Sequence, residues 1–181
     1  KGGADVVTFS GDKMLGGPQA GIILGRKSWI DAMKKNQLTR ALRVDKMTLC
    51  ALEATLKLYR DPEAVRREVP TVRMLTEQQE TLLPRAVALQ ARLEALGTAY
   101  ETALYETSSE VGGGSLPLEK LPTWAVAVKP SQTSTQRLAD ALRARALPIV
   151  ARVVEDRLIF DLRTLQDGEA DEIALALKEL I

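Results

Sequence analysis

One lysine of this chain stands where a side chain could do chemistry. Lys13 follows an apolar, β-branched segment at residues 5–10 and lies among glycines, with Ser10 three residues before it. The chain contains no histidine, which excludes the commonest general base, nucleophiles activated by imidazole and nearly every zinc site. A lysine activated by burial or by a covalent cofactor is the leading substitute. By position alone, an ordinary surface lysine on a loop fits Lys13 at least as well.

Three kinds of lysine site compete for residues 10–21. Ser10 and Lys13 have the spacing of a Ser-x-x-Lys catalytic pair, but such a pair opens a helix, and Gly11 with the later Gly-Gly-Pro opposes one. Phosphate loops need Gly-Lys-Ser/Thr and dinucleotide folds need Gly-x-Gly-x-x-Gly, and both patterns are missing. The third is a lysine that forms a Schiff base with pyridoxal phosphate, where an upstream hydroxyl helps to hold the phosphate. Ser10 fits that role.

Two arginines form a second candidate group. Arg40 and Arg43 are three residues apart, so a helix would place them on one face, where their forked donors could hold a phosphate-like anion. Together with Lys34, Lys35 and Lys46 they also fit a solvated basic stretch. From the residues alone, that second interpretation is preferred.

The first elements of the chain must position these side chains. The apolar pattern predicts buried strands at residues 5–10 and 21–25, a helix capped by Ser28 that runs to about residue 35, and a helix at residues 44–59. Prolines after residue 60 predict a domain boundary near residues 68–71.

A second unit is expected after that boundary. A capping box at Thr76 should open its first helix, which Pro84 should kink or divide. The pattern predicts a helix, two strands, a helix, a strand hairpin and a last helix, at residues 76–96, 99–107, 123–129, 133–146, 149–154 with 157–163, and 169–180. This order is that of a small α+β layer structure.

Composition limits the class of protein further. The 181 residues carry a formal net charge of +1, which gives no global attraction to nucleic acid or to an acidic membrane. Cys50 is the single cysteine, so no internal disulfide can form. No apolar run approaches the roughly 20 residues that span a bilayer. We therefore expect a soluble, cytoplasmic protein with no metal site and no membrane partner.

Several segments carry a resemblance to a known family. They are Ser10–Gly21 (SGDKMLGGPQAG), Gly25–Lys27 (GRK), Arg40–Lys46 (RALRVDK), Thr48–Leu56 (TLCALEATL) and Gly112–Pro117 (GGGSLP). These segments resemble bacterial selenocysteine synthase, the L-seryl-tRNA(Sec) selenium transferase, and the similarity runs from Asp5 to the end of the chain. The lysine loop joined to the Arg-x-x-Arg block is far more specific than Ser-x-x-Lys alone.

The resemblance implies both a fold and a reaction. It implies a fold-type-I pyridoxal phosphate enzyme, assembled as a ring of dimers, that converts seryl-tRNA(Sec) to selenocysteinyl-tRNA(Sec) through an aminoacrylyl intermediate, with selenophosphate as donor. Lys13 would carry the cofactor and, once free, take the α-proton, while Ser10 would help to bind the cofactor. Arg40 and Arg43 would line the pocket of the anionic donor.

The resemblance also implies a domain organisation. In fold-type-I enzymes the cofactor lysine lies late in the large domain, so we expect an α/β chain in which residues 1–69 are the carboxyl-terminal part of that domain. Residues 70–181 would then be the small α+β domain, and the chain would be a carboxyl-terminal fragment that is inactive alone. Two alternatives remain open: a related pyridoxal phosphate lyase that acts on a small amino acid, and a non-catalytic oligomerisation fragment.

Overall fold

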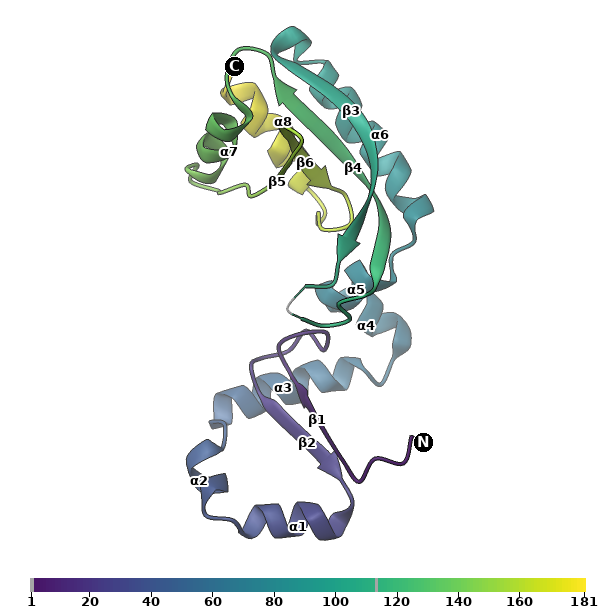
Figure 1. Ribbon diagram of the computed structural model, residues 1–181, viewed down its shortest axis with the longest axis vertical. Helices are drawn as coiled ribbons and strands as arrows, with labels where there is room; N and C mark the ends of the chain where they lie inside the picture. Colours follow the sequence, from purple (N-terminus) through teal and green to yellow (C-terminus); the bar gives the residue numbers. More distant parts are fainter. Residues whose placement is uncertain (1, 113) are drawn as a thin grey trace. The chain divides into compact units, whose positions relative to one another are not determined.

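The computed structural model describes residues 2–112 and 114–181 (Figure 1). The chain is mixed α/β and divides into two compact units, each of which is described by itself. Residues 2–76 with 114–115 form the first unit, and residues 77–112 with 116–181 form the second. Lys1 and Gly113, which belong to segments singled out in the sequence, lie outside the described residues. None of the described helices is both long and apolar enough to cross a membrane.

The first unit opens with an antiparallel hairpin of β1 (Val6–Ser10) and β2 (Gly21–Gly25), in which Ser10 lies opposite Gly21. Both strands were expected from the sequence and are confirmed. Their predicted burial is wrong in this chain, because the side chains of Val7 and Phe9 are 50% and 39% exposed. A two-stranded sheet offers few neighbours to bury its side chains.

Five helices follow the hairpin in the first unit. They are α1 (Lys27–Lys35), α2 (Leu38–Leu42), α3 (Lys46–Leu58), α4 (Pro62–Glu68) and α5 (Pro70–Thr76). The sequence predicted α1 and α3, and it missed the three short helices. The predicted cap of α1 is wrong, since Arg26 occupies the N-cap position and Ser28 lies inside the helix.

Elements of the second unit follow the predicted order. They are α6 (Gln79–Glu94), a short 3-10 turn (Gly97–Ala99), β3 (Tyr100–Glu110), β4 (Lys120–Pro130), α7 (Thr135–Arg143), β5 (Arg152–Val154), β6 (Arg157–Asp161) and α8 (Glu169–Glu179). The predicted capping box is wrong, because Thr76 ends α5 and its hydroxyl donates to the Val72 carbonyl. Pro84 lies inside α6 without dividing it.

The four strands of the second unit form one antiparallel sheet in the order β3-β4-β6-β5. Helices α6, α7 and α8 bury their apolar stripes against one face, where Val126, Val128, Leu158 and Phe160 point into the main core. Ala125, Ala127 and Ile159 belong to a smaller cluster formed by strand residues alone. The main core therefore lies between the sheet and its helices.

Candidate functional site

The turn that carries Lys13 joins β1 to β2 and is held by backbone hydrogen bonds. The Gly11 N–H donates to the Ala20 carbonyl at 2.8 Å, and the Gly17 N–H donates to the Gly11 carbonyl at 2.8 Å. The Gly16 N–H donates to the carbonyl of Lys13 itself at 3.0 Å. These bonds fix the lysine backbone just beyond the end of β1.

Glycine is required at two positions of this turn. A Cβ on Gly11 would lie 2.6 Å from the Pro18 carbonyl oxygen, which is backbone and cannot swing aside. Gly16 has φ +68°, and its Cβ would lie 2.4 Å from Cγ1 of Val69, a buried side chain of the same unit. The two glycines therefore allow the chain to fold back closely around Lys13.

The Lys13 side chain is 47% exposed and lies beside a carboxylate. Its Nζ is 3.1 Å from Oδ2 of Asp12, and the Ser10 hydroxyl donates to the other oxygen of that carboxylate. The hydrogen bond from Ser10, followed by that from Lys13, lowers the pKa of Asp12 below its ordinary value. Asp12 was missed as a candidate in the sequence, although its place next to Lys13 was a visible signal.

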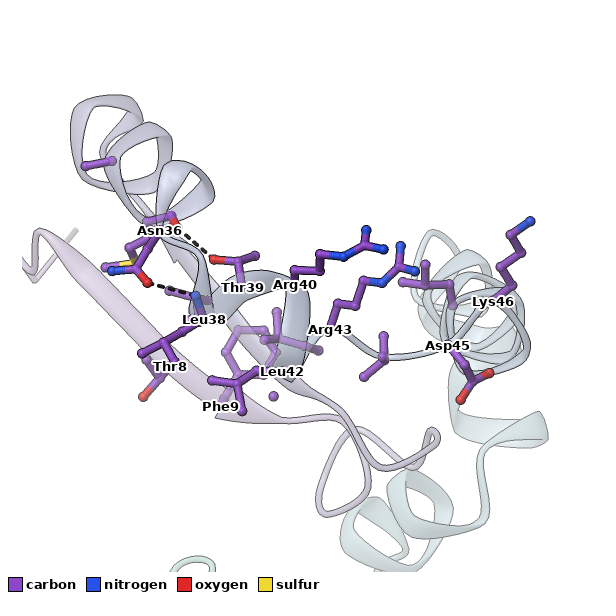
Figure 2. Close-up of a pocket in the computed structure, with 17 residues that line it drawn as sticks. Thr8, Phe9, Asn36, Leu38, Thr39, Arg40, Leu42, Arg43, Asp45 and Lys46 are labelled. Atoms are coloured by element: carbon purple, nitrogen blue, oxygen red, sulfur yellow. Dashed lines mark hydrogen bonds between the residues drawn. The ribbon is translucent and has the colours of Figure 1, made fainter.

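A cavity of about 1400 Å³ lies in the first unit (Figure 2). Backbone and side chains of the hairpin, including Thr8, Phe9 and Gly21, line it together with residues from α1, α2 and α3. Its polar side carries the guanidinium groups of Arg40 and Arg43, which Figure 2 draws pointing the same way. The rest of the lining is largely apolar.

The two arginines lie at the end of one short helix. Arg40 is within α2, and Arg43 is the C-cap residue with extended backbone (φ −64°, ψ 140°). Both are exposed, and within residues 2–112 and 114–181 neither forms an ion pair. Two unneutralised guanidinium groups at one cavity can hold an anion through paired donors.

The structure brings only part of the predicted site into one cavity. Arg40 and Arg43 line it, whereas Lys13 in the adjoining turn and Ser10 at the end of β1 are not among its lining residues. The hairpin connects the two groups, because Gly21, which pairs with Ser10 across the strands, belongs to the lining. The arrangement is thus an exposed primary amine paired with a carboxylate, in the turn of a hairpin whose strands line a cationic and apolar cavity.

The mixed α/β fold of this chain is shared with a solved enzyme. The structure of D-glucosaminate-6-phosphate ammonia-lyase matches it with a TM-score of 0.59 and 26% sequence identity, over 98% of this chain and 44% of that chain. The family model described as "SelA: L-seryl-tRNA selenium transferase" matches residues 1–166. The chain therefore belongs to the L-seryl-tRNA selenium transferase family, as the sequence resemblance predicted.

Relatives named L-seryl-tRNA(Sec) selenium transferase support the same membership. The protein of Moorella thermoacetica is 50% identical over 180 residues, and that of Nitratidesulfovibrio vulgaris is 51% identical over 180 residues. The Geobacter sulfurreducens protein is 49% identical over 179 residues. Each alignment covers 98% or 99% of this chain, but the chain spans only 38% or 39% of the length of these relatives.

Proposed function

We propose that this chain is part of an enzyme that converts seryl-tRNA(Sec) to selenocysteinyl-tRNA(Sec) with selenophosphate as donor. The observation that carries the proposal is the exposed amine of Lys13, held in a turn that only glycines permit, in a chain of the selenium transferase family. Within that enzyme we assign residues 1–69 to the end of the large domain and residues 70–181 to the small domain. The working enzyme is a cytoplasmic homo-oligomer, a ring of dimers.

The residues of the Lys13 turn suit pyridoxal phosphate. The cofactor needs a primary amine that solvent and ligand can reach, and the Lys13 side chain is about half exposed. It also needs hydroxyl or backbone donors near its phosphate, and Ser10 supplies a hydroxyl three residues upstream. Bound pyridoxal phosphate supplies an electron sink that stabilises a carbanion next to the amino group.

The chain's own side chains then have distinct tasks. Lys13 would hold the cofactor through its side-chain amine, and that amine, when free, would accept the proton from the seryl Cα. Asp12, whose carboxylate lies 3.1 Å from Nζ, keeps this amine at the end of β1. The Ser10 hydroxyl donates to Asp12 here and would turn to the cofactor phosphate when that group binds.

Arg40 and Arg43 bind the anionic donor. A selenophosphate group presents several oxygens, and two guanidinium forks on one cavity wall match them with paired, charge-assisted hydrogen bonds. Transfer of selenium breaks the P–Se bond of the donor, water supplies the replacing oxygen, and the inorganic phosphate that forms can be bound by the same arginines. Inorganic phosphate is therefore a usable probe of this part of the site.

Replacement of Lys13 tests the proposal in the full-length protein. Borohydride reduction followed by peptide mass spectrometry should locate a pyridoxyl group on Lys13, and Lys13→Ala should abolish both this modification and the visible band of bound cofactor. Lys27→Ala is the matched control, because Lys27 is an exposed lysine of the same unit that pairs with Asp31. Unchanged cofactor attachment in Lys13→Ala would refute the assignment.

A second candidate function follows from the likeness to the ammonia-lyase. A related pyridoxal phosphate lyase acting on a small amino acid would use the same lysine but would need no acceptor tRNA. Comparing the turnover of seryl-tRNA(Sec) with that of free serine and cysteine separates the two. Turnover of the free amino acids alone would favour the lyase.

A further inference from the structure

A third cation lines the cavity of Arg40 and Arg43. Lys46 is the first residue of α3 and is among the residues that line the same cavity. Figure 2 draws the Lys46 amine extending outward from α3 and not toward the guanidinium groups of Arg40 and Arg43, and it draws the carboxylate of Asp45 pointing the opposite way from that amine. The neighbouring residues 45 and 46 thus direct their charges apart.

The Asp45 carboxylate accepts hydrogen bonds from the first turn of α3 and does not pair with Lys46. One carboxylate oxygen accepts the Thr48 N–H and the other accepts the Thr48 hydroxyl, both at 2.9 Å. These two bonds are the N-cap of α3. Among the described residues no carboxylate lies within ion-pair distance of the Lys46 amine.

The place of Lys46 in the helix gives its charge no local benefit. The first turn of a helix favours acidic side chains and disfavours cations, since unpaired N–H groups concentrate positive charge there. Nevertheless α3 carries Lys46 at its first position and has no acidic residue in its first turn. The Lys46 charge therefore does not stabilise the helix that it begins.

The net charge of the lining points to the kind of anion that fits. Two arginines and one carboxylate leave a single net positive charge, and Lys46 raises it to two. A phosphate group with a second pKa near 6 carries about −1.5 to −2 at neutral pH. Lys46 is the residue that brings the cavity to the charge of a phosphate-type dianion.

We infer that Lys46 is a third anion-binding residue of this cavity and sets its preference for dianions over monoanions. The inference rests on the proposed function, in which Arg40 and Arg43 bind the donor. The arginines supply directional forks, and the lysine supplies a compact charge on a flexible stem that reaches the remaining oxygens.

Binding of inorganic phosphate to the full-length protein tests this inference. Lys46→Met keeps the aliphatic stem and removes the charge, so we expect phosphate to bind about tenfold more weakly, with most of the loss restored in Lys46→Arg. Lys34→Met is the matched control, because Lys34 is an exposed lysine of α1 that does not line the cavity, and its affinity should stay within about twofold of wild type. Affinity for formate, a monoanion, should fall less than that for phosphate in Lys46→Met.

The outcomes separate this inference from the proposed function. If Arg40→Met weakens phosphate binding but Lys46→Met does not, the inference about Lys46 is wrong and the donor site stands. If neither variant weakens binding, the donor site itself is wrong. Equal losses for phosphate and formate in Lys46→Met would overturn the stated preference for dianions.

Discussion

At the scale of single residues, the Lys13 turn depends on glycines, because a side chain at these positions would collide with neighbouring atoms. Gly16 combines a positive φ of +68° with a Cβ position only 2.4 Å from a buried Val69 methyl group. The Tyr59 hydroxyl adds a hydrogen bond to the Leu15 carbonyl at 2.9 Å, and burial raises the pKa of this phenol. The turn is therefore supported from several sides, and Lys13 is presented from a constrained backbone.

Gly16→Ala should destabilise the first unit by about 3 kcal/mol. About 1 kcal/mol comes from the left-handed backbone and the rest from crowding against Val69. Gly3→Ala is the matched control: Gly3 also has a positive φ of +79°, but nothing lies within 4 Å of its Cβ position, so only the backbone cost of about 1 kcal/mol applies. Urea unfolding monitored by circular dichroism measures both, and equal losses would contradict the crowding argument.

At the scale of elements, aspartate caps begin two helices of the first unit. Asp45 caps α3 through Thr48, and Asp61 caps α4 by accepting the N–H groups of Glu63 and Ala64. The hydrogen bond from the Thr48 N–H lowers the pKa of Asp45 most, and the hydrogen bond from the Thr48 hydroxyl lowers it further. A lowered carboxylate pKa adds stability above the unfolded value of about 3.9, and this stability is lost as the pH falls through the lower folded value.

Thr48→Val should raise the pKa of Asp45 toward its ordinary value. The substitution removes the hydroxyl bond and keeps the backbone bond, so the pKa should stay below that of a free aspartate. Thr55→Val is the control in the same helix, because the Thr55 hydroxyl donates to the Ala51 carbonyl and not to a carboxylate. Carboxyl-detected NMR titration reports the shift, and an unchanged Asp45 in Thr48→Val would show that the hydroxyl has no part in it.

At the scale of the whole molecule, the two units differ in how much apolar surface they bury. In the described part of the first unit, Ala20, Val65 and Val69 are the buried apolar side chains, whereas the second unit buries a continuous core between its sheet and three helices. A buried polar group also ties its strands together, because Asp161 on β6 accepts the hydroxyls of Ser109 on β3 and Thr123 on β4. Stability should therefore concentrate in the second unit.

Hydrogen exchange of this chain alone should show that difference. Amides of β4 and β6 near residues 125–128 and 158–161 should exchange slowest, and those of β1 and β2 should exchange far faster. Mass spectrometry at two protein concentrations provides the control, because self-association through the exposed apolar residues of the first unit would add protection only at the higher concentration. Strong protection of β1 at low concentration would contradict the expectation.

Local patterns in the sequence determined most of the elements and their chemical candidates. Apolar spacing predicted β1, β2, α3 and the full order of the second unit, and the residues around Lys13 identified the family because their motifs are contiguous. The apolar spacing did not predict the short helices. Helix α2, for example, spans five residues, which is too short to show a helical period of apolar residues. The Asp61-Pro62 start of α4 is a visible capping signal, but it was interpreted only as punctuation.

Tertiary structure decided how the candidate residues are grouped. No local pattern shows that a hairpin at residues 6–25 and a helix that begins at Lys46 line one cavity, because such contacts depend on long-range packing. Local hydrogen bonds hold the Asp45 carboxylate at the start of α3, while Arg40, Arg43 and Lys46 are among the residues that line the cavity. The sequence by itself thus determined the family and singled out Lys13 as a candidate, and only the folded chain decided which cations line one cavity.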